Sequence, residues 1–120
     1  MDKGVLLEHK VYSTNSSDIH YDFLVENELD CVTWKVFKLP LLNQASIEIS
    51  KQPNHRLVWL SRIEHELSGN RGFVKRIDHG ILKNISDKLE SEYCRFILDG
   101  ELIHGLFEIS GNSCRLSTNY

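Results

Sequence analysis

Short apolar or alternating segments recur along the whole chain, and turn-forming residues separate them about every 8–12 residues. The predicted strands are residues 5–11, 19–26, 31–39, 45–50, 73–77, 80–82, 93–98, 102–109 and 114–116. A helical pattern is confined to residues 86–92, where Ser86 can cap a single turn. Many short strands with few helices between them are typical of antiparallel barrels and sandwiches. The pattern therefore predicts an all-β domain of one of these two kinds.

Turn signals set the expected ends of several strands. Asp99-Gly100 lies between two apolar segments, and this dipeptide is favoured in tight hairpins because it tolerates positive φ. Pro40 and Pro53 are expected to end the strands before them, because proline lacks the N–H that a ladder needs. Asp78 and His79 are expected to join two separate short strands.

Composition limits the classes of protein to which the chain can belong. A length of 120 residues suits one domain, residues 1–120, with a modest core. A net charge of −3 argues against coating nucleic acid by charge alone, and leaves room for a local basic patch. Three cysteines without a CxxC spacing indicate neither a disulfide framework nor a zinc ribbon. Without a signal peptide or a spanning apolar run, we expect a cytoplasmic protein with no membrane partner.

The segment from His20 to Phe23 carries the clearest chemical signal. His20 and Asp22 are two residues apart, so on a strand both side chains lie on one face while Tyr21 and Phe23 lie on the other. Imidazole and carboxylate together suit divalent ions such as zinc or manganese. A surface pair on a half-exposed strand is the alternative explanation.

A basic cluster lies in the second half of the chain, at Arg71, Lys75, Arg76 and His79. Lys75 and Arg76 fall on opposite faces of one predicted strand, so they cannot both line one groove. The cluster is either a phosphate-contacting surface or a solvated strand face.

Four motifs, in order, resemble one known family. They are the run His20-Tyr21-Asp22-Phe23-Leu24-Val25-Glu26, then Trp34 and Lys38 before Pro40, then residues 55–57 with the Gly-containing loop 68–72, and lastly the hairpin 96–105. This series resembles the 3′-phosphoesterase domain of bacterial and archaeal DNA ligase D, in particular its short stand-alone members. The match covers nearly the whole chain.

The resemblance implies a small antiparallel β-barrel with at most one short helix. It also implies removal of 3′-terminal phosphates and ribonucleotides from DNA ends, with manganese as cofactor and zinc as the alternative. Carried over residue by residue, the metal ligands would be His9, Asp22 and His55. His20 would lie beside the attacked phosphate and Lys38 near it. Arg71 and Arg76 are not carried over from the family; they are expected, as members of the basic cluster, to supply phosphate or nucleic-acid contacts. DNA or RNA/DNA 3′ ends and a repair ligase would be partners of a monomeric protein.

The sequence departs from the family pattern at specific positions. The first metal histidine should lie six residues before His20, where this chain has Thr14. His9 takes that role if the intervening loop is longer by about five residues, which loops tolerate. Leu24 replaces an arginine that would bind phosphate in a bidentate manner, and Trp59 replaces a tyrosine.

Two functions from different classes follow. The four retained residues His9, His20, Asp22 and His55 favour a metal-dependent 3′-phosphoesterase of DNA repair. Leu24 and Trp59 instead favour a catalytically weakened homologue that binds DNA ends or a repair partner. A phosphoesterase acting on another small phosphorylated substrate also fits the motifs.

Overall fold

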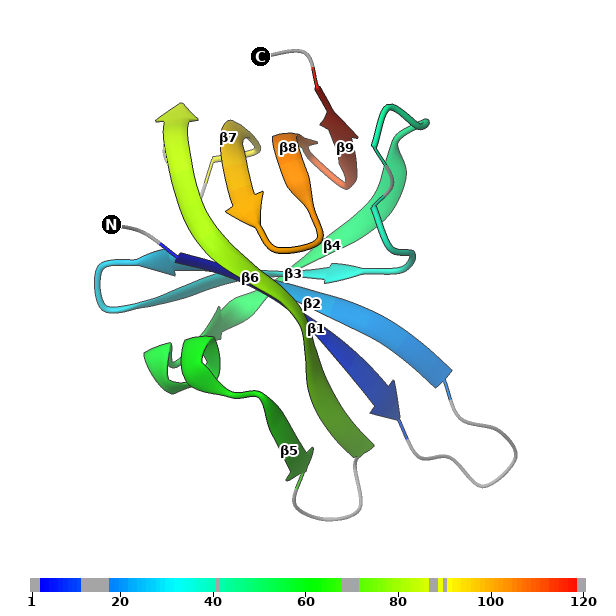
Figure 1. Cartoon of the computed structure of the whole chain (residues 1–120), viewed down its shortest axis with the longest axis vertical. Helices are drawn as coiled ribbons and strands as arrows, with labels where there is room; N and C mark the ends of the chain where they lie inside the picture. Colours follow the sequence, from blue (N-terminus) through cyan, green and yellow to red (C-terminus); the bar gives the residue numbers. More distant parts are fainter. Residues whose placement is uncertain are drawn as a thin grey trace.

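The computed structural model describes residues 3–11, 18–40, 42–67, 72–86, 89 and 91–118. Strands make up most of this part of the chain, with one short 3₁₀ helix (Figure 1). The elements are β1 (Lys3–Val11), β2 (Asp18–Asn27), β3 (Asp30–Val36), β4 (Ile47–His55), η1 (Leu57–Ser61), β5 (Glu64–Leu67), β6 (Gly72–Ser86), β7 (Tyr93–Gly100), β8 (His104–Ser110) and β9 (Ser113–Ser117).

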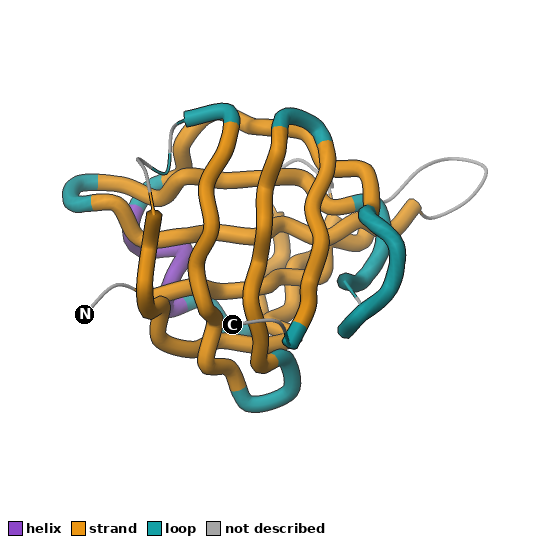
Figure 2. Tube along the Cα trace, turned by 90° about the horizontal axis from the view of Figure 1, so that it is seen from above, coloured by secondary structure: helices purple, strands orange, loops and turns teal. Residues whose placement is uncertain are grey.

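The strands close into an antiparallel barrel. Their order is β1-β2-β3-β4-β9-β8-β7-β6, and a further pairing between β1 and β6 closes the ring (Figure 2). β5 pairs with β6 outside the ring. Closure satisfies backbone groups that an open sheet would leave at its edges. The predicted all-β barrel with at most one short helix is thus confirmed. That helix is η1 and not the predicted segment 86–92, of which Ser86 belongs to β6 and residues 87, 88 and 90 lie outside the described residues. None of the described helical residues form a span that could cross a membrane.

Aromatic side chains fill the barrel interior. Phe23 lies at the centre, with its ring centroid 5.0 Å from that of Phe107 and 5.7 Å from that of Phe96. Trp34 on the neighbouring strand is 2% exposed and packs in the same cluster. The alternation around Phe23 and Trp34 therefore gives each strand an inner face and an outer face.

β4 does not end at Pro53, so that prediction was wrong. Gln52 pairs with Thr33 and His55 pairs with Cys31, so two residues of β4 lie opposite the single residue Val32. This arrangement is a β-bulge, which leaves a ladder position unpaired and can accommodate a proline.

β6 is one strand of 15 residues, and the predicted interruption at Asp78 and His79 was also wrong. Its register against β1 shifts between Leu7↔Arg76 and Leu6↔Asp78, so Ile77 is a bulged residue. The strand continues to Ser86, where the sequence predicts a helix cap instead.

The hydrogen bonds of Asp78 explain why β6 can continue past a residue with a buried carboxylate. The side chain is inside the barrel, where the residue is 3% exposed, and it accepts hydrogen bonds from three successive backbone N–H groups of the turn between β7 and β8. Their donors are Glu101, Leu102 and Ile103, at 2.8, 3.1 and 2.6 Å. A Cβ on Gly100 would lie 2.5 Å from Asp78 Oδ2, so this glycine makes room for the carboxylate.

Candidate functional site

His20 and Asp22 lie on the outer face of β2, opposite in direction to the buried Phe23. His20 Nε2 is 3.5 Å from Asp22 Oδ1, and each side chain is 14% exposed. The predicted placement of both groups on one face is confirmed. An imidazole and a carboxylate that are close together and partly shielded from water can share a proton, a metal ion or a phosphate.

The paired ends of β1, β2, β5 and β6 extend away from the rest of the barrel (Figure 1). In this extension the register places His9 of β1 directly opposite His20. Directly opposed residues of an antiparallel pair have Cα atoms about 4.5–5.5 Å apart, so the backbone of His9 lies beside that of His20. Thr14, the other candidate for the first ligand, lies outside the described residues.

His55 lies elsewhere on the sheet. It pairs with Cys31, which pairs in turn with Glu26, four positions along β2 from Asp22. Four strand positions correspond to about 13 Å, whereas metal–ligand bonds are about 2.1 Å long. The His55 ring contacts Trp59 edge-on at 6.1 Å, and its Nδ1 lies 3.1 Å from the carbonyl oxygen of Pro53.

The expected ligand set is therefore brought together only in part: His9 and Asp22 are close in the register, and His55 is not. Among the described side chains, no group of three or more His, Cys, Asp or Glu could hold a metal ion. The donors at His9, His20 and Asp22 are nonetheless of the nitrogen and oxygen types that manganese and zinc accept.

Lysines flank this region at two positions. Lys38 is exposed and lies two residues beyond the end of β3. Lys35 is half-buried and is the residue that pairs with Asp22 across β2 and β3. The motif comparison selects Lys38 by its distance from Pro40. Strand alternation around the buried Trp34 is the signal that places Lys35 on the outer face, and the register of β2 and β3 then sets it opposite Asp22.

The two main departures from the family pattern meet in one apolar cluster. Leu24 is fully buried with Val5 and Cys31 on the outer face of the sheet, and Trp59 and Leu60 of η1 cover them. An arginine at position 24 would have to bury its guanidinium beneath η1, at a high desolvation cost. Leu24 and Trp59 therefore belong to the same packed cluster, in which an apolar residue at position 24 goes together with an aromatic cover at position 59.

Of the two predicted nucleic-acid contacts, Arg71 lies outside the described residues. Arg76 is half-buried on β6 and pairs with Leu7, which pairs on its other side with Asp22. Two strand spacings, about 10 Å, separate Arg76 from Asp22. The arginine is thus in the same row of the sheet as the candidate site.

The three cysteines are free and buried. Burial raises the pKa of Cys31 to about 11, with Asp30 and Glu26 adding to the effect. Burial and the neighbouring Cys94 raise the pKa of Cys114 to about 12. Cys31 and Cys114 therefore stay protonated near neutral pH and do not form reactive thiolates.

No protein-family model matches the chain, and no curated protein matches it. The resemblance of its motifs to the ligase D phosphoesterase domain is therefore carried by the quoted residues alone.

Proposed function

We propose that the chain is a divalent-metal-dependent phosphoesterase that acts on the 3′ ends of nucleic acids. The observation that carries this proposal is the half-buried pair of His20 and Asp22, 3.5 Å apart and beside His9 in the register. A partly shielded imidazole and carboxylate on an outer face, with Arg76 in the same row, suit a phosphate substrate.

In this proposal Asp22 and His9 hold manganese or zinc, and His55 does not complete the set in the conformation described. When bound, the ion would polarise a phosphoryl oxygen and lower the pKa of a bound water. His20 lies next to the phosphate and donates a proton to the leaving oxygen. Asp22 orients the His20 ring through the contact between Nε2 and Oδ1. Lys35 and Lys38 supply positive charge near the substrate.

The substrates would be DNA or RNA/DNA 3′ ends in the cytoplasm, and a repair ligase would use the healed end. The protein would act as a monomer. A net charge of −3 leaves few phosphate contacts, so we expect weak, salt-sensitive binding of the strand.

The experiment is to incubate the purified chain with a 3′-phosphorylated primer-template and either Mn²⁺ or Zn²⁺, and to follow release of the phosphate. We expect wild type to release phosphate and both His20→Ala and Asp22→Asn to lose most of this activity, by about 100-fold or more. His104→Ala is the matched control, because His104 is an exposed histidine that contacts Asp99 on another face. Full activity of Asp22→Asn, or an inactive wild type with both metals, would contradict the proposal.

A second function is favoured by Leu24. This residue is buried under η1 where the resemblance expects a phosphate-binding arginine, and His55 lies apart from Asp22. Both features fit a module that binds 3′ ends without turnover. Retention of a 3′-phosphorylated strand by a wild type that releases no phosphate would support this alternative.

A further inference from the structure

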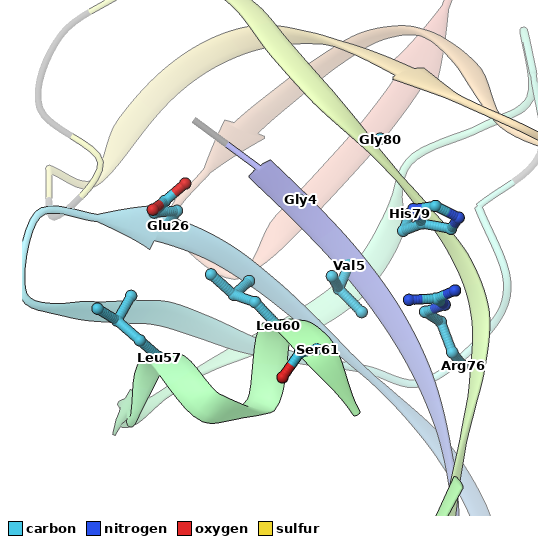
Figure 3. A pocket seen from close by; sticks show the side chains of 9 residues that line it. All are labelled: Gly4, Val5, Glu26, Leu57, Leu60, Ser61, Arg76, His79 and Gly80. Atoms are coloured by element: carbon cyan, nitrogen blue, oxygen red, sulfur yellow. The ribbon is translucent and has the colours of Figure 1, made fainter. Parts of the chain in front are cut away.

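A cavity of about 440 Å³ lies between η1 and β6, with β1 as its floor (Figure 3). Its volume is within the range of pockets that hold small organic ligands, about 300–1,000 Å³. No motif in the sequence marks it, because its walls come from β1, β2, η1 and β6. It lies on the outer face of the barrel, next to the cluster that covers Leu24.

One side of the cavity carries positive charge. The Arg76 guanidinium extends from β6 toward β1, below the ring of His79 (Figure 3). Across the described residues, no carboxylate forms an ion pair with Arg76. His79 Nε2 lies 3.2 Å from Glu101 Oε1 at the rim. A half-buried arginine without a carboxylate offers its planar set of N–H donors to an anion, and phosphate accepts them in a bidentate manner.

The remaining walls are of two other kinds. Leu57 and Leu60 are three residues apart in η1, so both lie on the same side of the 3₁₀ helix, and both line the cavity together with Val5. Glu26 lies at the end of the cavity away from Arg76 (Figure 3). A ligand that complements all three walls has an anionic end, an apolar or planar middle, and hydroxyl or amino donors at its other end.

We propose that this cavity binds a mononucleotide, with the phosphate at Arg76 and His79 and the nucleoside over Leu57 and Leu60 toward Glu26. The phosphate matches the arginine side of the cavity, and the ring system matches the leucine side. The hydroxyl or amino donors of the sugar or base match the end at Glu26. Arg76 is about 10 Å from Asp22 across the sheet, so a nucleotide held here can belong to the strand whose end reaches Asp22. Its role as the pocket of the substrate strand rests on the proposed function, whereas nucleotide binding itself does not.

The test is calorimetric titration with deoxyadenosine 3′-monophosphate in the presence of EDTA, so that no metal-dependent step contributes. We expect the nucleotide to bind at least about tenfold more tightly than deoxyadenosine, because the nucleoside leaves Arg76 without its partner. Arg76→Gln should weaken nucleotide binding by about tenfold or more, and Arg76→Lys should restore only part of it. Arg95→Gln is the matched control, because Arg95 is an exposed arginine of β7 outside the cavity.

Thermal unfolding of each variant establishes that it is folded at the temperature of the titration. Equal affinity for nucleotide and nucleoside, unchanged affinity in folded Arg76→Gln, or no binding to wild type would overturn the inference. Nucleotide binding without phosphate release on the primer-template would reject the phosphoesterase and leave the cavity assignment standing. Phosphate release together with unchanged nucleotide binding in Arg76→Gln would reject the cavity assignment and leave the phosphoesterase standing.

Discussion

At the scale of single residues, buried polar groups set the main constraints. Asp78 is the clearest case, because its carboxylate is inside the barrel and holds the turn between β7 and β8 through three backbone N–H groups. A fourth bond, from the N–H of His79 at 2.8 Å, lies within its own strand. One side chain therefore fixes the position of a turn that is more than twenty residues away in the sequence.

Asp78→Ala should destabilise the protein by about 3 kcal/mol, because the N–H groups of the turn lose charge-assisted bonds and become unsatisfied. Asp78→Asn should fall between wild type and alanine, since its amide oxygen can replace only one carboxylate oxygen. Urea unfolding measures both. The control is Asp99→Ala, an exposed carboxylate next to the same turn, which should change stability little. Equal losses in the two alanine variants would show that Asp78 does not hold the turn.

The buried thiols give a prediction about pH. The pKa is raised from 9.0 to about 11 for Cys31 and to about 12 for Cys114, so the folded state keeps their protons where the unfolded state has lost them. Below pH 9 the ionisation of these thiols should therefore not change the free energy of unfolding with pH. Above pH 9 the free energy of unfolding should fall as pH rises, because the unfolded state loses their protons first. Urea unfolding at a series of pH values, compared with a Cys31→Ala variant, measures this contribution. A slope above pH 9 that is the same in both proteins would contradict it for Cys31.

At the scale of elements, η1 serves as a cover for the outer face of the sheet. The helix is only five residues long, yet its Trp59 and Leu60 pack on Leu24, Val5 and Cys31. The Arg62 guanidinium carbon lies 5.4 Å from the centre of the Trp59 ring, which adds a cation–π contact on the helix. The same helix supplies one wall of the proposed nucleotide cavity, so its position links stability to binding.

Leu24→Ala should cost about 3 kcal/mol and Trp59→Ala about 2 kcal/mol, because the first leaves a cavity and the second removes its cover. Since the two side chains belong to one cluster, the double variant should lose less than the sum, by about 1 kcal/mol. Chemical denaturation of the four proteins gives this coupling. The control cycle combines Leu24→Ala with Phe107→Ala, a core residue on the inner face, and should be additive. If the losses of stability from Leu24→Ala and Trp59→Ala add up in the double variant, the packing of η1 on Leu24 does not stabilise the protein.

At the scale of the whole molecule, ring closure depends on a row of glycines. Gly4 of β1 pairs with Gly80 of β6, and Gly80 pairs with Gly100 of β7, so three strands meet without side chains at this level. A Cβ on Gly80 would lie 2.2 Å from the backbone oxygen of Asp99. β6 curves through the middle of the fold at this level and pairs with β1, β5 and β7 along its length (Figure 1).

Gly80→Ala should therefore destabilise the barrel by about 3 kcal/mol or more, because the backbones of β6 and β7 would have to move apart. Gly111→Ala is the comparison, since a Cβ there has open space and only the positive φ of 57° opposes it. That variant should lose about 1 kcal/mol. Thermal unfolding compares the stability of the two variants. A smaller loss of stability in Gly80→Ala than in Gly111→Ala would contradict the role of the glycine row in ring closure.

The sequence alone determined the features that depend on local periodicity. Alternation predicted which side chains of β2 and β3 enter the core and which lie outside, and so it placed His20 and Asp22 on one face. It also predicted most strands, the pairing of β7 with β8 as a hairpin and the all-β class. The predicted turn at Asp99-Gly100 was wrong, because both residues belong to β7, neither has a positive φ, and the turn lies at residues 101–103. These features could be predicted because a strand presents every second residue to the same side, whatever its partners are.

Only the tertiary structure decided which distant residues meet. Whether His55 joins Asp22 depends on the β3–β4 register and on the bulge at Pro53, and neither is visible in a local pattern. Asp78 looks like a strand breaker until the turn that satisfies its carboxylate is known. Leu24 looks like an exposed position until η1 covers it, and the cavity beside Arg76 exists only once β6 closes on β1. In each case the deciding interaction is a contact between elements that are far apart in the chain. Such a contact forms only when the strands pair in one register and the ring closes, and a local sequence pattern does not contain that information.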